Sequence, residues 1–417
     1  MRAIIALVAP LMIALWAPAQ AQQPSSSSPL TVKIGVLSDM SSLYADIGGP
    51  GSVAAAQMAV QDFNPASHHM KVEIVSADHQ NKPDIGAAIA RRWFDTAQVN
   101  AIADVPNSGV ALAVSNVTRQ KNGVFLVSGA ADSDLTDKQC SPNTVHWAYD
   151  TWALAHGTGG AIVRQGGKTW FFITADYAFG HALERDTSAV VEAADGKVLG
   201  AVRHPLNTAD FSSYLLQAQG SKAQVIGLAN AGGDTINSVK QAAEFGIVKG
   251  GQRLAGLLVF LTDVHALGLP TAQGLTLTTA FYWDLDDKTR AFAKRFAAHN
   301  AGKYPTMVHA GVYSSVLHYL EAVSKTGSAT DGAKVVEAMK STRTDDPLFG
   351  DTVVRQDGRA VHAMYLVEVK KPAESKGPYD YFKVLATIPA EQAFRPLAQE
   401  RGTCSLVKTG SPQTGAE

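Results

Sequence analysis

Short apolar runs alternate along the chain with longer stretches whose apolar residues recur at helical spacing. The run 32–37 predicts a buried strand, and the helix expected after it places Val53, Val60 and Phe63 on one face. The glycine-rich stretch 48–51 between them indicates a tight turn. The same pattern predicts strands at 71–76, 101–105 and 124–128, and helices at 85–97 and 110–121. Apolar strands that alternate with helices are typical of a parallel sheet covered on both faces.

The alternation starts again after 144–150, where we expect the chain to enter a second lobe with helix 152–164 and strand 169–174. The last predicted strands, at 352–355, 360–370 and 380–388, break the alternation and indicate another passage between the lobes. We therefore predict an α/β fold with two discontinuous lobes. The predicted boundaries are 31–147 with 282–350 for lobe 1, 148–281 with 351–404 for lobe 2, and 405–417 for a C-terminal tail.

The N-terminus has the pattern of a secretory signal peptide, residues 1–21. Arg2 precedes an apolar run at 3–16, and small residues precede a predicted cut after Ala21. The apolar run is too short to span a bilayer. Residues 22–30 are polar and rich in serine, so we predict a flexible leader there. The mature chain is expected to be exported.

Length and charge narrow the class of protein. The mature part of this 417-residue chain is longer than one hydrophobic core usually serves, which favours two lobes. The formal net charge of -1 offers no electrostatic support for binding nucleic acid or an anionic membrane.

Small polar residues follow several predicted strands. In the first half these are Ser41-Ser42, Asn107-Ser108-Gly109 and the stretch 128–133. Ser, Asn and Asp often cap helices, but three such loops at one sheet edge favour a binding cleft, since ligands bind beyond the carboxyl ends of parallel strands. In the second half, Tyr177 and Phe179 lie on a strand-end loop, where their rings either contact a ligand or pack beneath the loop.

Motifs of common enzyme classes are missing. The stretch GGKT at 166–169 is like the end of a phosphate-binding loop, but Ile162 replaces the first glycine and a strand follows the stretch. No serine has the glycine spacing of a nucleophile elbow. His68 and His69 have no third metal ligand at a useful spacing. We predict no enzyme activity, no metal and no cofactor.

The two cysteines, Cys140 and Cys404, are expected in an oxidising compartment. Paired cysteines of exported proteins usually form a disulfide, and we predict one here. The alternative is a pair of free thiols, one of which would be reactive.

Four stretches resemble one family. They are the opening VKIGVLSDMSSLYADIGGPG, then SGAADSDLT at 128–136, DYAFG at 176–180 and FGDTVVRQDGR at 349–359. In order and spacing the mature chain resembles the type I periplasmic solute-binding proteins of ABC importers, in the branched-chain amino acid group. The resemblance implies two α/β lobes, joined by three crossovers, that close on a small solute in the periplasm. The stretches CSPN at 140–143 and FYWDLDD at 281–287 are similar to a subgroup in which some members bind aromatic carboxylates.

The resemblance also implies roles for residues of both lobes. Ser108 and the donors of 130–133 would hold a carboxylate, and the loop 177–179 would supply an aromatic contact. The loop at Asn230 lacks the tyrosine of many amino acid binders, and Asp263 would replace the acidic residue that meets an α-ammonium group. The full predicted set is Ser42, Tyr44, Asn107, Ser108, Ala130, Ala131, Asp132, Ser133, Tyr177, Phe179, Asn230, Asp263 and Tyr282.

The expected function is capture of a small carboxylate, either an aromatic or other hydrophobic acid or a hydrophobic amino acid, for delivery to an ABC permease of the inner membrane. The predicted state is a monomer that does not bind nucleic acid. Two alternatives stay open: a ligand-sensing receptor domain, and an exported α/β enzyme.

Overall fold

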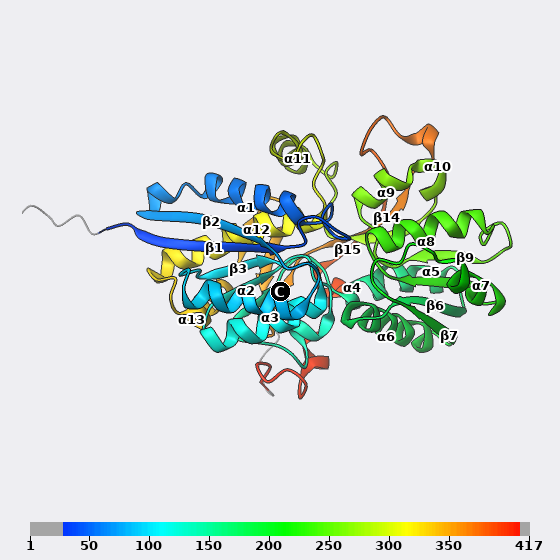
Figure 1. Ribbon diagram of the computed structural model, residues 1–417, viewed down its shortest axis with the longest axis horizontal. Helices are drawn as coiled ribbons and strands as arrows, with labels where there is room; N and C mark the ends of the chain where they lie inside the picture. Colours follow the sequence, from blue (N-terminus) through cyan, green and yellow to red (C-terminus); the bar gives the residue numbers. More distant parts are fainter. Residues whose placement is uncertain (1–27, 409–417) are drawn as a thin grey trace, which may run out of the picture.

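Each lobe is built around a sheet of parallel strands (Figure 1). The structure, a computed structural model, describes residues 28–408. The sheet of lobe 1 has the order β2-β1-β3-β4-β5. Its strands are β1 (Leu30–Ser38), β2 (Met70–Asp78), β3 (Ala101–Asp104), β4 (Val124–Val127) and β5 (Thr144–His146). The helices around it are α1 (Gly49–Phe63), α2 (Pro83–Asp95), α3 (Ser108–Lys121), α11 (Asp287–His299), α12 (Met307–Thr326) and α13 (Gly332–Lys340).

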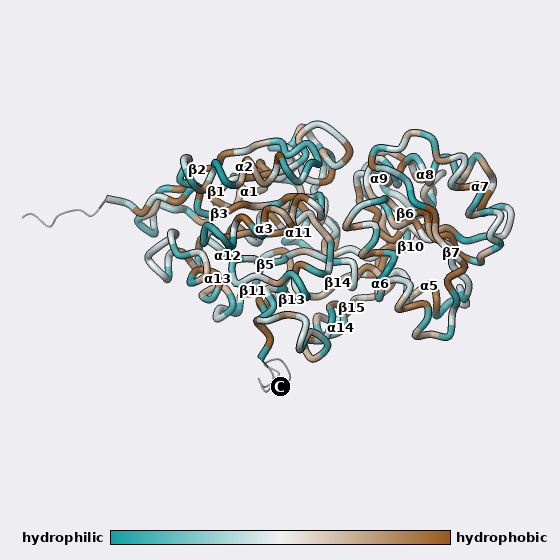
Figure 2. The backbone as a smooth tube through the Cα atoms, turned by 60° about the horizontal axis from the view of Figure 1, so that its bottom comes forward, coloured by the Kyte–Doolittle hydropathy of each residue, from teal (hydrophilic) through white to brown (hydrophobic). Residues whose placement is uncertain are grey.

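The alternation of side chains along β1 explains why helices cover both faces of this sheet. Val32, Ile34 and Val36 pack in the core that includes α1 and α12. Leu37 packs in a separate core with Trp93 and the helices α2 and α3. Successive strand residues point to opposite faces, so a fully apolar strand needs helices on both sides. Apolar positions accordingly follow the central strands of the lobes (Figure 2).

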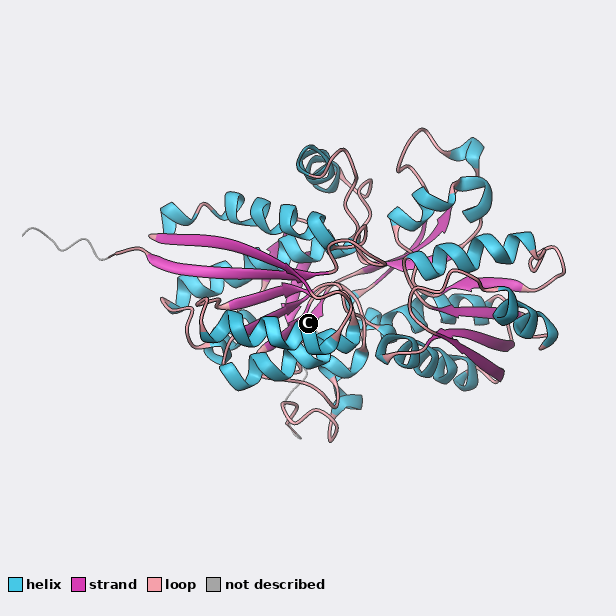
Figure 3. Ribbon diagram, viewed as in Figure 1, coloured by secondary structure: helices cyan, strands magenta, loops and turns pink. Residues whose placement is uncertain are grey.

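Lobe 2 repeats this arrangement with the strand order β7-β6-β8-β9. Its parallel strands are β6 (Thr169–Ala175), β7 (Lys197–His204), β8 (Val225–Ala229) and β9 (Arg253–Gly256). Its helices are α4 (Thr151–Leu154), α5 (Gly160–Arg164), α6 (Ala178–Ala193), α7 (Ser212–Gly220), α8 (Gly233–Glu244), α9 (Leu261–Leu267) and α10 (Leu269–Ala272). Figure 3 shows the strands of both lobes enclosed by helices. The predicted two-lobed α/β fold is confirmed.

The late strands are antiparallel. β10 (Thr276–Thr279) pairs with β14 (Met364–Val369), which pairs with β15 (Phe382–Ile388). A second small sheet contains β11 (Thr344–Asp346), β12 (Gly350–Val354) and β13 (Ala360–Val361), and the short helix α14 (Ala390–Ala393) contacts β13. The predicted strand 360–370 is thus two strands, because the chain leaves one sheet at His362 and joins another.

Up to β15 the chain crosses between the lobes three times, at 147–150, 280–286 and 362–363, as the family resemblance implied, and the return after β15 is a fourth crossing. After β15 the chain returns once more to lobe 1. There Cys404 forms the predicted disulfide with Cys140, with 5.6 Å between their Cα atoms.

Strand pairing differs from the predicted boundaries in the last part of the chain. The prediction assigned all of 351–404 to lobe 2. In the structure Arg359, beside β13, forms a parallel bridge with His146 of β5, and Cys404 is bonded to lobe 1. A local apolar pattern predicts a strand without saying which sheet the strand joins. The other boundaries stay a prediction.

Some predicted segments fall outside the described residues: the signal peptide and most of the leader and the tail. Within residues 28–408, no helix is long and apolar enough to cross a membrane.

Candidate ligand-binding site

A pocket lies between the two sheets, at the carboxyl ends of their parallel strands. Lobe 1 lines it with residues that follow β1, β3, β4 and β5, and lobe 2 with residues that follow β6, β8 and β9. The lining residues are Tyr44, Ile47, Pro106, Gly129, Ala131, Tyr149, Tyr177, Phe179, Ala231, Leu258 and Phe260. This is the sheet edge where ligands of parallel α/β folds bind.

The pocket is small, and the lobes are closed over it. It encloses about 250 Å³ of space between atoms, part of it open to solvent. The hydroxyls of Tyr44 in lobe 1 and Tyr177 in lobe 2 are 2.7 Å apart and share a hydrogen bond. Burial raises the pKa of both phenols, so both stay neutral. Gly232 of lobe 2 approaches lobe 1 so closely that a Cβ would lie 2.6 Å from the carbonyl oxygen of Leu43.

Aromatic rings form much of the wall. Tyr177 and Phe179 are neighbours, with ring centroids 5.9 Å apart. Tyr149 meets Phe260 edge to face at 6.1 Å, and its hydroxyl donates a 2.6 Å hydrogen bond to the Gly129 carbonyl oxygen. None of the lining side chains is charged. Such a wall suits an apolar or flat molecule better than a sugar, whose hydroxyls would need more polar partners.

A model of the periplasmic binding proteins matches residues 31–377, most of the chain. The chain belongs to this family. Since the family's members bind solutes for ABC transporters, the chain is a solute-binding protein and not an enzyme. Membership also gives the periplasm as its location.

Relatives agree with this assignment. A periplasmic binding protein from Burkholderia mallei is 54% identical, with a TM-score of 0.87 over 91% of this chain and 99% of that one. A branched-chain amino acid ABC transporter ligand-binding protein from Burkholderia xenovorans is 43% identical, with a TM-score of 0.80 over 90% of this chain and 100% of that one. The Leu/Ile/Val-binding protein homolog 6 of Brucella melitensis is 28% identical and covers 82% of this chain and 88% of its own.

Four predicted site residues line the pocket of this solute-binding protein: Tyr44, Ala131, Tyr177 and Phe179. Three of the four are aromatic: Tyr44 comes from lobe 1, and Tyr177 and Phe179 come from lobe 2. Tyr177 and Phe179 also pack against the core, as the alternative role beneath the loop implied, but both line the pocket as well.

Four more predicted residues are buried next to the lining of lobe 1. Ser108 Oγ accepts long hydrogen bonds of 3.3 Å from the N–H groups of Ala131 and Asp132. Asn107 caps α3 through a 3.1 Å bond from the Val110 N–H group, and the Ala130 carbonyl oxygen is 2.8 Å from His146 Nε2.

Asp132 caps a short helical turn at 133–136 and accepts a 3.0 Å bond from the Asp134 N–H group. Burial raises the pKa of Asp132 to about 7, and the nearby charge of Asp134 adds to this shift.

The other five predicted residues are absent from the lining and bind other protein groups. The Ser42 hydroxyl is exposed and donates to Asp39 at 2.8 Å. Ser133 Oγ donates to Asp186 of α6 at 2.8 Å. Asn230 accepts a 2.8 Å bond from the Thr235 hydroxyl.

Asp263 accepts a 2.9 Å bond from the Phe260 N–H group and caps α9; burial raises its pKa to about 7. The Tyr282 hydroxyl donates to Asp380 at 3.3 Å, and its ring packs in the core of lobe 2. For these groups a partner within the protein replaces the predicted ligand.

Sequence reasoning missed seven lining residues: Ile47, Pro106, Gly129, Tyr149, Ala231, Leu258 and Phe260. Leu258 and Phe260 lie in an apolar run whose sequence is typical of a buried strand. In the structure β9 ends at Gly256, so these two residues lie on the loop after the strand, where they reach the pocket. Tyr149 is in the first crossover, and its place between two predicted lobes is the one signal that could have identified it.

No group of three or more His, Cys, Asp or Glu side chains that could hold a metal ion occurs within residues 28–408.

Proposed function

We propose that this protein captures a small carboxylate with an aromatic or hydrophobic body and delivers it, as a monomer, to an ABC permease of the inner membrane. The observation that carries this proposal is a pocket between two lobes that is bounded by five aromatic rings and no charged side chain. The pocket is small, which favours a compact solute.

The carboxylate end has donors in lobe 1. The N–H groups of Ala131 and Asp132 donate to Ser108 Oγ over 3.3 Å, a long distance that marks weak bonds. An anion at this place would accept from both N–H groups and from the Ser108 hydroxyl, and hydrogen bonds to a charged acceptor are the stronger kind.

The body of the solute would lie among the rings of Tyr44, Tyr177 and Phe179. An α-ammonium group would need an acceptor there, and Asp263 is not in the lining because it caps α9. A buried ammonium without an acceptor loses much of its hydration free energy. We therefore favour amine-free acids over branched-chain amino acids, although the relatives named for branched-chain amino acids make leucine the main alternative.

A thermal-shift panel of leucine, phenylalanine, benzoate and hydroxycinnamates tests the solute class. We expect the amine-free acids to raise the melting temperature most, since a ligand stabilises the folded form that binds it. Tyr177→Ala should weaken binding at least about tenfold, because it removes a buried aromatic contact. Tyr282→Phe, a matched change outside the lining, should bind as the wild-type protein does. Shifts with leucine alone would reverse our preference, and a response to sugars alone would refute the carboxylate.

Closure of the lobes should accompany binding. A solute that contacts both lobes binds the closed form better and shifts the population toward it. Small-angle X-ray scattering is expected to show a smaller radius of gyration with saturating solute than without it. Tyr44→Phe removes one hydroxyl of the pair between the lobes and should enlarge the radius of the solute-free protein. An unchanged radius on confirmed binding would rule out this mechanism.

A further inference from the structure

Asp104 is a fully buried carboxyl group beside the pocket, and neither the fold nor the proposed contacts account for it. It is the last residue of β3, and its Oδ2 accepts a 2.7 Å hydrogen bond from the Ser38 hydroxyl. Its Oδ1 is buried and has no hydrogen-bond partner within the described residues. Buried polar atoms are nearly always paired, so an unpaired carboxyl oxygen next to a binding pocket calls for a partner.

The backbone holds this carboxyl group in an unusual conformation. Asp104 has a φ of 80° and Val105 a φ of 59°, so two successive residues with side chains adopt the left-handed region. A β-branched residue such as Val105 rarely does so. Strain of this kind persists where the surrounding structure fixes it, and it is concentrated at functional sites.

The unpaired oxygen lies close to Gly129, a residue of the pocket lining. A Cβ added to Gly129 would lie 2.6 Å from Asp104 Oδ1 and 2.7 Å from the Cα atom of Pro106. Gly129 and Pro106 both line the pocket. Asp104 Oδ1 therefore lies directly behind the pocket wall, at a place where any side chain would displace it.

Among the described residues that influence Asp104, none is positively charged, so none would neutralise a bound anion. The hydroxyls of Ser38 and Ser52 face the carboxyl group and favour its ionised form, whereas Asp39 opposes ionisation. Tyr149 comes from the crossover and donates to Gly129 instead. Burial is the largest influence and raises the pKa of Asp104 to about 6. A second negative charge in the pocket would raise this pKa further.

We propose that Asp104 is a specificity-determining residue that carries a proton whenever the pocket holds a carboxylate, so that solute and proton bind together. This inference rests on the proposed function. The proton removes the repulsion between two buried carboxylates, and it lets Asp104 act as a hydrogen-bond donor. An amide analogue of the solute, which is neutral, needs no such proton.

Isothermal titration calorimetry at pH 7 in phosphate and in Tris buffer measures proton uptake, with benzoate or the tightest-binding acid of the panel as the probe. We expect uptake close to one proton per solute. Above pH 6 the dissociation constant should rise toward tenfold per pH unit, since each added unit makes protonated Asp104, the form that binds the acid, about tenfold scarcer. Asp104→Asn should take up no proton, and its dissociation constant should change less than about threefold from pH 6 to 8. Benzamide should bind the wild-type protein without pH dependence.

Asp263→Asn is the matched control, because Asp263 is also buried with a raised pKa but caps α9 outside the lining. It should keep the proton uptake. Uptake that persists in Asp104→Asn, or that is lost in Asp132→Asn instead, would overturn the role of Asp104. If Asp104→Asn fails to fold, the wild-type protein alone decides, since binding of the acid without uptake contradicts the inference. Failure of every panel acid to bind would refute the proposed function itself.

Discussion

Arg359→Ala is expected to lower the free energy of unfolding by about 3–5 kcal/mol, because it leaves a buried carboxylate without its counter-charge. The Arg359 guanidinium is fully buried, and its Nη1 lies 3.4 Å from Asp150 Oδ2. It also donates to the carbonyl oxygens of Trp147 at 2.5 Å and Tyr149 at 3.1 Å. Its Cζ atom lies 4.3 Å from the ring centre of Phe394. One side chain thus joins three segments between the lobes.

The position of Arg359 explains why the loss should be large. Trp147, Tyr149 and Asp150 belong to the first crossover, Arg359 directly precedes β13, and Phe394 follows β15. Burial already raises the pKa of Asp150, and the guanidinium opposes that shift. Without Arg359 the carboxyl group must take up a proton or remain buried with an uncompensated charge, and the carbonyl oxygens of Trp147 and Tyr149 each lose the hydrogen bond from the guanidinium.

Urea unfolding at pH 7 followed by circular dichroism measures the change. Arg343→Ala is a matched control, since Arg343 pairs with Asp351 at the exposed surface, where an ion pair contributes little. The control should unfold as the wild-type protein does. If Arg359→Ala behaves like the control, the guanidinium contributes no more than a surface pair and the connections are held by packing alone.

Elements with strong local signals were predictable from the sequence. The apolar run 32–37 lies within β1, and the helix predicted at 110–121 ends at the same residue as α3. A buried parallel strand reads as a continuous apolar run, and an amphipathic helix repeats its apolar positions every three to four residues. The sheet to which a late strand belongs has no such signal, because pairing depends on partners far along the chain. The strand predicted at 360–370 therefore hid a change of lobe.

The pocket was predictable where its residues stand out against their surroundings. Tyr177 and Phe179 were identified because rings on a strand-end loop need something to pack against. Ser133 also looked like a ligand contact, but its hydroxyl is bonded to Asp186, 53 residues away. Polar residues at strand ends serve a ligand or a distant part of the chain equally well, and the sequence does not separate the two.

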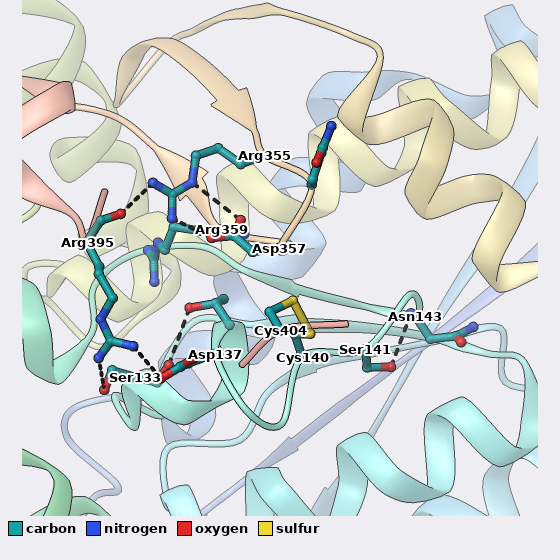
Figure 4. The surroundings of a disulfide bond; sticks show 12 residues. Ser133, Asp137, Cys140, Ser141, Asn143, Arg355, Asp357, Arg359, Arg395 and Cys404 are labelled. Atoms are coloured by element: carbon teal, nitrogen blue, oxygen red, sulfur yellow. Dashed lines mark hydrogen bonds and ion pairs between the residues drawn. A yellow bond between two sulfur atoms is a disulfide. The ribbon is translucent and has the colours of Figure 1, made fainter. Parts of the chain in front are cut away.

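The disulfide is the second feature whose removal should have a large effect. Cys140 lies in the loop between β4 and β5, and Cys404 belongs to the segment that follows β15. Figure 4 shows the bridge between the two cysteines. Val407 packs with the two cysteines, and Arg395 of the same segment binds Asp137 at 2.5 Å and Ser133 at 3.3 Å. The bridge thus fixes the C-terminal segment beside the loop that supplies Ala131 to the pocket.

Cys140→Ser/Cys404→Ser is expected to lower the free energy of unfolding by about 2–5 kcal/mol. The bridge joins residues 264 positions apart, and in the chain-entropy model a loop of this length restricts the unfolded chain by about 5 kcal/mol. Native strain and residual structure in the unfolded chain usually make the measured value smaller. The contacts of Arg395 should hold part of the segment in place after the bridge is gone.

Urea unfolding of the wild-type protein with and without reductant, beside the double serine variant, tests this expectation. Reduction should shift the wild-type curve toward that of the variant and leave the variant unchanged, because only the wild-type protein has a bridge to lose. The same midpoint for the oxidised and the reduced protein would mean that the bridge contributes nothing to the free energy of unfolding. The segment lies beside the loop that contains Ala131. The reduced protein should therefore also bind the panel acids more weakly, because the N–H groups of Ala131 and Asp132 are then held less firmly in place.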